Sequence, residues 1–359
     1  MKMQRIAIIN LKGGVGKSVT ACNLACILGQ MHHRHVLVMD LDKQANTSKF
    51  FKAFAFGAST VADVMMESID LSDIIQKTDF EYVDVAPSSM SMIKANREVM
   101  LDVTRPQHNR LRKALNGIAD KYDYCILDCP PDIDMATINA LVAADWVIVP
   151  VDCDEWAFDG LFEIMEQVDA VRENYNPGIK VMGILATKYT RGTYSEKVLI
   201  QLDQLDKMHY PVFRAEDGGV LRIDYSVKVK EAKTEHLPIY CYRVPASTEY
   251  RQLADIVEKM VEGEKTMTEM DKLDAMLTEK GIAHIYDRAF QGGTQIVVPD
   301  AQKWYWDAVC TPYSYGGRVG KLEVMGKNLL GYGGVKGYLD AEDVMQLFDA
   351  AEKIGRKVR

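Results

Sequence analysis

A short segment near the start of the chain combines glycines with two lysines and a hydroxyl group. It reads Lys12, Gly13, Gly14, Val15, Gly16, Lys17 and Ser18, after an apolar run and before a helical pattern. In such a strand–loop–helix context, glycines let backbone N–H groups turn towards phosphate oxygens, and the helix N-terminus adds its positive dipole. Lys17 would reach the β- and γ-phosphates of a nucleotide, and the Ser18 hydroxyl would contact Mg²⁺. The segment therefore predicts a nucleotide-binding loop, with an ordinary glycine-rich turn as the alternative.

The loop departs from the common GxxxxGK[ST] pattern, because Leu11 occupies the place of its first glycine. Its distinguishing feature is a second lysine, Lys12, inside the loop. A cation with no phosphate to neutralise in its own loop gains most by reaching one across an interface. We therefore expect Lys12 to act between two copies of the chain.

Three aspartates stand where apolar runs end. Asp40 and Asp42 are two residues apart, so on an extended strand end they share a face. Asp128 ends another apolar run, where a carboxylate is costly unless it serves a ligand, and holding a Mg²⁺-bound water suits it. Hydrolysis of a phosphoanhydride needs a metal, positive charge on the phosphate oxygens and a group that orients the attacking water. Ordinary turn carboxylates are the alternative for Asp40 and Asp42.

The elements that position these residues are near-continuous apolar runs, typical of strands buried on both faces, with helical stretches between them. The expected strands are 5–10, 35–40, 81–86, 124–128, 146–151 and 180–187, and examples of the helices are 18–31 and 158–174. This alternation predicts an α/β fold with a doubly wound, mostly parallel sheet. Ligands bind such sheets at the carboxyl ends of the strands, where the loop and the aspartates fall.

The pattern changes after residue 261. The polar segment 262–268 reads as a linker between a domain at 1–261 and a small α+β accessory domain at 269–359, whose role the sequence does not indicate. In that second part we expect a helix at 269–280, antiparallel strands at 282–290, 294–299, 304–311 and 321–325, and a closing helix at 339–354.

The composition is that of a soluble globular protein, with 48% apolar and 26% charged residues. No apolar run approaches the roughly 18 residues that a membrane span needs, and the N-terminus has no signal-peptide anatomy, so we expect a cytoplasmic protein. The seven cysteines are scattered without a CxxC pair, which indicates small buried side chains. Residues 265–359 carry 13 basic and 13 acidic side chains, so the net charge of −8 lies on residues 1–264. Any DNA contact must therefore come from a local basic patch.

Four segments together resemble the ParA/MinD family of P-loop ATPases, the class with a deviant Walker A loop. KGGVGKS at 12–18 is similar to that loop, and VLVMDLDKQANTS at 36–48 is similar to the family's DLDPQGN segment. YDYCILDCPP at 122–131 is similar to its Walker B strand, and NALVAADWVIVPV at 139–151 to the segment that follows. The resemblance covers roughly residues 1–260. It is closest to the short ParA-type partition ATPases, because the first strand begins almost at Met1.

The resemblance implies an ATPase fold with ATP and Mg²⁺ as cofactors, and a hydrolysis rate that is slow until a partner stimulates it. ATP would lie against the loop residues 12–19, which extend as far as Val19. The residues implied in catalysis are Lys12, Lys17 and Asp42, the last of which would polarise the attacking water. The residues implied at the metal, directly or through water, are Ser18, Asp40 and Asp128.

The resemblance also implies a switch. Lys12 would reach the partner's nucleotide in a homodimer that forms on ATP and that hydrolysis dissolves. The segment 130–132, with its two prolines, would form the second switch loop, which moves when the γ-phosphate is lost. Lys43 and Ala45 stand where the family has its proline and its glycine, and these departures affect the switch geometry and the turnover rate rather than nucleotide binding.

DNA partition is the function that the resemblance favours. The ATP dimer would bind DNA non-specifically on the nucleoid, and a ParB-like partner would trigger release. Such binding needs Lys and Arg side chains that face phosphates. By matching flanks, the family's basic residues correspond to Arg191, Arg222, Lys228 and Lys230, with ordinary solvated cations as the alternative. The run 105–113 is denser in cations and is expected on an exposed helix, again with ordinary solvated cations as the alternative.

Other functions that use the same type of ATPase domain fit the sequence less well. Membrane positioning of the MinD kind is the alternative, but the terminus LFDAAEKIGRKVR has too few bulky apolar residues for a membrane-binding helix. A cargo-positioning ATPase that uses residues 269–359 as its adaptor is another. An electron-transfer relative would need paired cysteines at the dimer axis, which the sequence lacks.

Overall fold

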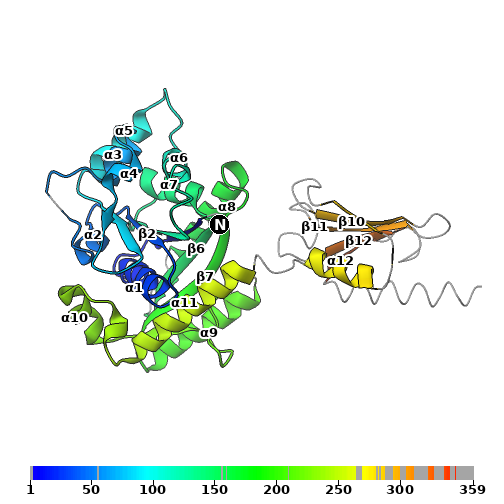
Figure 1. Cartoon of the computed structure of the whole chain (residues 1–359). Helices are drawn as coiled ribbons and strands as arrows, with labels where there is room; N and C mark the ends of the chain where they lie inside the picture. Colours follow the sequence, from blue (N-terminus) through cyan, green and yellow to red (C-terminus); the bar gives the residue numbers. More distant parts are fainter. Residues whose placement is uncertain are drawn as a thin grey trace, which may run out of the picture. The chain divides into compact units, whose positions relative to one another are not determined.

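The computed structural model describes residues 3–263 apart from 55, 155, 156, 159 and 209, and beyond them residues 269–279, 282, 284–287, 294–299, 305–310, 322–326, 335–339 and 344. The chain divides into two compact units, Met1–Lys259 and Met260–Arg359 (Figure 1). Helix α11 (Pro245–Gly263) takes in the first two residues of the predicted linker, and residues 264–268 lie outside the described residues. The division at 261 and 269 therefore stays a prediction.

An eight-stranded sheet forms the centre of the first unit, in the order β3-β4-β2-β5-β1-β6-β7-β8. Its strands are β1 (Gln4–Ile8), β2 (Val36–Asp40), β3 (Gln76–Lys77), β4 (Val83–Ala86), β5 (Tyr124–Asp128), β6 (Trp146–Asp152), β7 (Lys180–Tyr189) and β8 (Arg222–Asp224). All neighbours are parallel except β3 and β4, so the predicted doubly wound, mostly parallel fold is confirmed. The sequence did not predict β3 and β8, because these two- and three-residue edge strands are partly exposed and form no apolar run.

Helices cover both faces of the sheet. Figure 1 shows α5, α6 and α7 on one side and α1, α9 and α11 on the other. The helices of this unit besides α11 are α1 (Lys17–Gln30), α2 (Asn46–Phe50), α3 (Val61–Met65), α4 (Leu71–Ile74), α5 (Met92–Leu101), α6 (Arg110–Asn116), α7 (Met135–Ala143), α8 (Leu161–Asn174), α9 (Thr193–Lys207) and α10 (Val227–Glu235). A short 3-10 turn, η1 (Ile239–Cys241), follows α10.

Helix α1, which begins at the end of the glycine-rich loop, is buried along nearly its whole length. It packs so closely on the sheet that a Cβ at Gly29 would come within 2.6 Å of a Val83 methyl carbon on β4. The cysteines Cys22 and Cys26 on α1, Cys125 on β5 and Cys129 just after it are buried, as predicted, whereas Cys241 is exposed. This packing fixes the start of α1 relative to the strand ends around it.

The second unit combines α12 (Glu269–Glu279) with an antiparallel sheet of five strands, in the order β13-β12-β11-β10-β9. The strands are β9 (Ile285–Asp287), β10 (Thr294–Pro299), β11 (Tyr305–Cys310), β12 (Leu322–Gly326) and β13 (Val335–Leu339). One side of α12 packs its apolar residues on Ile296 and Ala308 of the sheet. The predicted α+β character is thus present, but β13 was not predicted, and Leu339 ends this strand instead of starting a helix. Val344 is helical, and the rest of the predicted helix at 339–354 lies outside the described residues.

None of the helices that the structure describes is both long and apolar enough to cross a membrane.

Candidate nucleotide-binding site

The sheet register brings three chain segments to one edge. Strand β5 lies between β1 and β2, and Asp128 pairs with Ile8 of β1 and with Asp40 of β2. The loops that leave these three parallel strands therefore start side by side at the carboxyl edge of the sheet. The glycine-rich loop follows β1, Asp42 follows β2, and the segment 130–132 follows β5.

The glycine-rich loop runs from the end of β1 to the first turn of α1, as predicted from the sequence. Gly14 and Gly16 have φ angles of +80° and +97°, in the left-handed region that favours glycine. The Asn10 carboxamide oxygen accepts a hydrogen bond from the Lys12 N–H at 2.8 Å, and the Thr187 hydroxyl donates to the Val15 carbonyl at 2.8 Å. These contacts hold the loop as a turn around the N-terminus of α1, which is the geometry that binds phosphate.

The Lys17 ammonium is folded over this turn. Its side chain is 7% exposed, and Nζ donates to the carbonyl oxygens of Asn10 at 2.9 Å and Lys12 at 3.1 Å. Burial lowers the pKa of Lys17, and the negative charge of Asp128 partly opposes that shift, as do Asp42 and Asp132. The structure thus places one cation within the influence of carboxylates from the other two strand ends.

Asp40 is fully buried and both its oxygens are used. Oδ2 accepts from the Ser48 amide at 2.8 Å and the Ser48 hydroxyl at 2.7 Å, and Oδ1 accepts from the Asp42 amide at 3.1 Å. Burial raises the pKa of Asp40, the charge of Asp128 adds to that shift, and the bonds from Ser48 oppose it. With its acceptors already taken, Asp40 is placed to support the site rather than to contact a metal itself.

Asp128 differs from Asp40 because one of its oxygens has no partner. Oδ2 accepts from the Thr47 hydroxyl at 2.7 Å, while Oδ1 is buried and has no hydrogen-bond partner within the part of the chain that the structure describes. Burial raises the pKa of Asp128, and the hydroxyls of Thr47 and Ser18 oppose the shift. An unpaired buried acceptor is costly, so a Mg²⁺-bound water fits here.

Among the described residues no group of three His, Cys, Asp or Glu side chains could hold a metal. Mg²⁺ needs no such group, because it keeps several waters and takes its remaining oxygens from phosphates and one or two protein groups. The residues that the sequence predicted for it, Ser18, Asp40 and Asp128, lie at the same edge of the sheet.

Asp42 lies in a tight turn between β2 and α2. Its side chain is 8% exposed; Oδ1 accepts from the Gln44 amide at 2.9 Å, and its carbonyl accepts from the Ala45 amide at 2.9 Å. Ala45 has a φ of +52°, so this chain places an alanine in a left-handed position that a glycine adopts more easily. Lys43 extends out of the turn to Asp132, with Nζ 3.2 Å from Oδ2, and so joins this turn to the predicted switch loop at 130–132.

Lys12 has a partner that the sequence did not predict. Its ammonium contacts both oxygens of Asp154, at 2.7 and 2.6 Å, in a partly exposed ion pair. Asp154 follows β6, which lies beside β1 in the sheet. A carboxylate at or near the end of a buried strand could have marked Asp154 as a candidate site residue, as it marked Asp128. Nothing in the sequence, however, linked Asp154 to Lys12.

The residues predicted to bind DNA gather near the carboxyl ends of β7 and β8, which pair at Tyr189 and Asp224. Arg191 follows β7, Arg222 is on β8, and Lys228 and Lys230 are on α10. Arg222 stacks 4.1 Å from the centre of the Tyr189 ring, and Lys228 pairs with Glu231. The side chains of Arg191 and Lys230 are exposed and make no ion pair with any residue in the described ranges.

The prediction of an exposed basic helix at 105–113 is wrong. Residues 105–109 precede α6, and Arg110 at its start is 3% exposed and bonded to Asp102. Arg105 and Lys113 both pair with Glu67. The fourth cation, Arg112, donates to the main-chain carbonyls of Val142 and Tyr175, so the run is not a free basic surface.

Comparison with known proteins adds to this geometry. A family model described as an AAA domain matches residues 3–181. The chain is 34% identical over 241 residues to the sporulation initiation inhibitor protein Soj of Bacillus subtilis, a match that covers 66% of this chain and 90% of Soj. It is 34% identical over 260 residues to the chromosome partitioning protein ParA of Caulobacter vibrioides, covering 69% of this chain and 91% of that protein. Among solved structures, cobyrinic acid a,c-diamide synthase from Mycobacterium smegmatis with bound ATP analog and magnesium has a TM-score of 0.62 and 26% identity, over 74% of this chain and 98% of that chain.

Proposed function

Because the chain belongs to the ParA/MinD family of P-loop ATPases, we propose that it is a DNA partition ATPase that dimerises on ATP. The dimer binds DNA non-specifically, and hydrolysis stimulated by a ParB-like partner protein releases it. The proposal that the chain binds ATP rests on one arrangement. The Lys17 ammonium and the Asp128 oxygen that has no partner among the described residues both lie beside the turn formed by the left-handed glycines. We further propose residues 1–261 as the ATPase domain, 262–268 as a linker, and 269–359 as an accessory domain.

The proposed chemistry assigns a task to each strand end. The amides of residues 12–19 cradle the phosphates of ATP, and Lys17 leaves its carbonyl partners to neutralise the β- and γ-phosphate oxygens. Ser18 and Asp128 hold Mg²⁺, with Asp40 in support, and the ion supplies positive charge on the phosphate oxygens. Asp42 orients the attacking water, and the turn that holds its Oδ1 on the Gln44 amide fixes its direction.

Replacing Asp42 by alanine should lower kcat for ATP hydrolysis about 100-fold, because the attacking water loses the group that orients it. ATP affinity should change less than about threefold, since Asp42 is assigned no contact with the bound nucleotide. Phosphate release measures the first and nucleotide titration the second. Asp79→Ala, which removes an exposed carboxylate paired with Lys52, is the control. Hydrolysis at the wild-type rate in the Asp42 variant would exclude the residue from the mechanism.

DNA binding is supported by the position of the free cations. Arg191 and Lys230 are exposed and lie around the same edge of the sheet as the nucleotide loop. A single subunit with a net charge of −8 offers few such cations, and a dimer doubles their number. Because non-specific affinity rises steeply with each phosphate neutralised, dimerisation makes DNA binding depend on ATP.

The experiment that tests this function is co-sedimentation with DNA of several unrelated sequences, with ATP or with ADP, at one stated salt concentration. We expect binding with ATP, little with ADP, and no preference among sequences. Flotation with liposomes under the same conditions tests membrane positioning. Equal DNA binding in the two nucleotides, or binding to liposomes alone, would contradict the proposal.

The variants Arg191→Ala and Lys230→Ala should each weaken DNA binding about threefold to tenfold, equally for all sequences, and should each reduce the salt dependence by about one phosphate contact. Lys113→Ala is the matched control, because it removes an exposed lysine that is already paired with Glu67. Fluorescence anisotropy over a series of salt concentrations measures both quantities. A loss confined to one DNA sequence would mean that these residues contact bases.

A further inference from the structure

The short helix α2 contacts both carboxylates of the nucleotide site. From its first turn, the Thr47 hydroxyl donates to Asp128 at 2.7 Å, and the amide and hydroxyl of Ser48 donate to Asp40 at 2.8 and 2.7 Å. Thr47 and Ser48 are buried. Any change in what Asp40 or Asp128 binds therefore acts directly on the backbone of α2.

The same helix also contacts α10, which carries Lys228 and Lys230. Lys233 of α10 donates from Nζ to the Asn46 carboxamide oxygen at 3.1 Å. His236, just after α10, lies with Nδ1 3.1 Å from the Phe50 carbonyl oxygen, and because that oxygen can only accept, Nδ1 is the donor. Residues 46 and 50 thus hold α10, while residues 47 and 48 hold the carboxylates.

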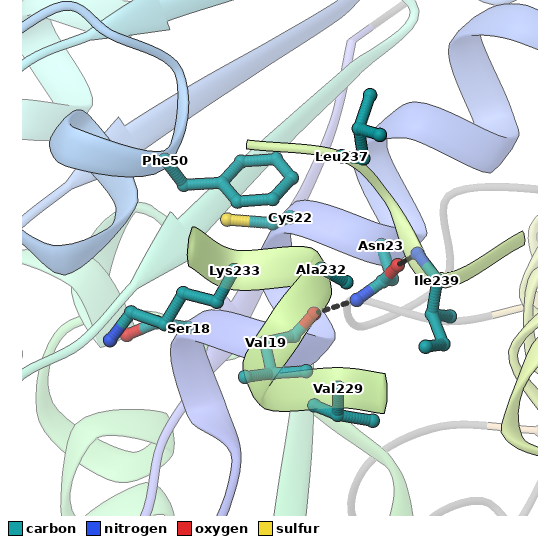
Figure 2. A pocket seen from close by; sticks show the side chains of 10 residues that line it. All are labelled: Ser18, Val19, Cys22, Asn23, Phe50, Val229, Ala232, Lys233, Leu237 and Ile239. Atoms are coloured by element: carbon teal, nitrogen blue, oxygen red, sulfur yellow. Dashed lines mark hydrogen bonds between the residues drawn. The ribbon is translucent and has the colours of Figure 1, made fainter. Parts of the chain in front are cut away.

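An apolar pocket separates α10 from the helices beneath it. Val229 and Ala232 of α10 face Val19 and Cys22 of α1, and Phe50 of α2 closes one side. Figure 2 shows Lys233 extending from this pocket towards Ser18 of the nucleotide loop, at the end of the pocket where both residues line it. The gap in the packing under α10 is small, about 30 Å³ in volume, and Ala232 beside it is buried.

Side-chain hydrogen bonds fix the chain after α10 to α1: the Tyr240 hydroxyl donates to the Gln30 carboxamide oxygen, and Asn23 makes two more bonds. Asn23 donates from Nδ2 to the Val19 carbonyl at 2.8 Å and accepts from the Ile239 amide at 2.7 Å, as the dashed lines in Figure 2 mark. The far end of α10 is therefore held on the nucleotide-loop helix. Its last turn is held by α2 through Lys233, and its start, with Lys228 and Lys230, is exposed.

We propose that α2 couples the nucleotide site to the DNA-binding helix α10, with the Lys233–Asn46 hydrogen bond as the link. This inference rests on the proposed function. If binding of Mg²⁺ and ATP changes the partners of Asp128, Thr47, which donates to that carboxylate, would move with it, and Ser48 would follow in the same helical turn. Asn46 and Phe50 follow as parts of the same helical turn, and α10 is set in the position that presents its lysines. By linkage, DNA bound to α10 tightens ATP binding by the factor by which ATP tightens DNA binding.

The test is the ratio of DNA affinities in ATP and in ADP, measured for the full chain and for Lys233→Met. We expect the ratio to fall about threefold to tenfold in the variant, because its side chain keeps its length but loses the donor. The tightening of ATP binding by DNA, measured by titration with a fluorescent ATP analogue, should shrink by the same factor. Lys233→Arg keeps the charge and the donor and should preserve the ratio.

Lys230→Met is the matched control, because Lys230 is an exposed cation of the same helix whose side chain makes no hydrogen bond or ion pair with α2 among the described residues. It should weaken DNA binding and reduce its salt dependence by about one phosphate contact per subunit, whereas Lys233→Met should lower the ratio and leave the salt dependence unchanged. A Lys233→Met protein that behaves like this control would overturn the coupling while leaving the proposed function intact. If the wild-type chain itself shows no preference for ATP, the proposed function is what fails.

Discussion

Replacing Lys17 by methionine should weaken ATP binding about 1000-fold. The ammonium that now donates to two main-chain carbonyls is the only lysine of the loop directed into the turn, and it is 7% exposed. Charge-assisted hydrogen bonds to phosphate contribute about 1.5–3 kcal/mol each, so the loss of two of them accounts for the expected change. Methionine fills the same space, so the fold should survive. Calorimetric titration with ATP measures the affinity, and thermal melting with and without ATP checks the fold.

Lys49→Met provides the control for that experiment. Lys49 is on α2, and its exposed side chain donates to the Gln44 carbonyl close to the site. It removes the same charge from the same region without touching the loop, so its ATP affinity should equal that of the wild type. A Lys17→Met protein whose ATP affinity stays within about tenfold of wild type would remove Lys17 from the phosphate site.

The sequence predicted the centre of the fold because the central strands are buried on both faces. Strands β1, β2 and β5 are almost wholly buried, so each had to be a continuous apolar run. Strands β8 and β13 were not predicted from the sequence, for two different reasons. Strand β8 is a partly exposed edge strand of three residues. Strand β13 has no long apolar run, and Gly337 at its centre weakens the alternation that marks a strand.

In the site, too, the sequence predicted the residues that a local pattern marks and missed those whose roles depend on distant contacts. Asp40 and Asp128 were identifiable because an acidic residue at the end of a buried strand conflicts with burial. Thr47 and Asp154 were not, because their roles depend on contacts with residues 81 and 142 positions away. The density of cations in the run 105–113 gave a wrong prediction for a related reason. The sequence shows how many cations the run contains, but it does not show that Glu67 and Asp102 form ion pairs with them.

These missed contacts change how the lysine that distinguishes the loop is understood. In isolation Lys12 was a cation without a phosphate of its own, free to reach across an interface. In the structure it is held by Asp154 of the same chain, at 26% exposure. A cross-subunit contact must therefore compete with an internal ion pair. Because exposed pairs of this kind contribute only about 0–1 kcal/mol, a nucleotide phosphate can win that competition.

Replacing Lys12 by alanine should raise the dissociation constant of the ATP dimer about 1000-fold. In a symmetric dimer each change occurs twice, so two phosphate contacts of about 2 kcal/mol are lost together. Binding of ATP by the single subunit should change less than about threefold, since Lys17 supplies the charge within the same loop. Light scattering over a range of protein concentrations, in the slowly hydrolysing Asp42→Ala background, measures the dimer.

Asp154→Asn shows whether the internal pair is a competitor or a support. If Lys12 acts across the interface, freeing it from Asp154 should tighten the ATP dimer by up to about thirtyfold, the value of two exposed ion pairs of up to about 1 kcal/mol each. If the pair only stabilises the loop, Lys12→Ala and Asp154→Asn both break it, and both should weaken the dimer in step. Opposite signs for the two variants therefore support the cross-subunit role of Lys12, and equal signs exclude it. The sign of the change is more informative here than its size, because the two hypotheses predict opposite signs for Asp154→Asn.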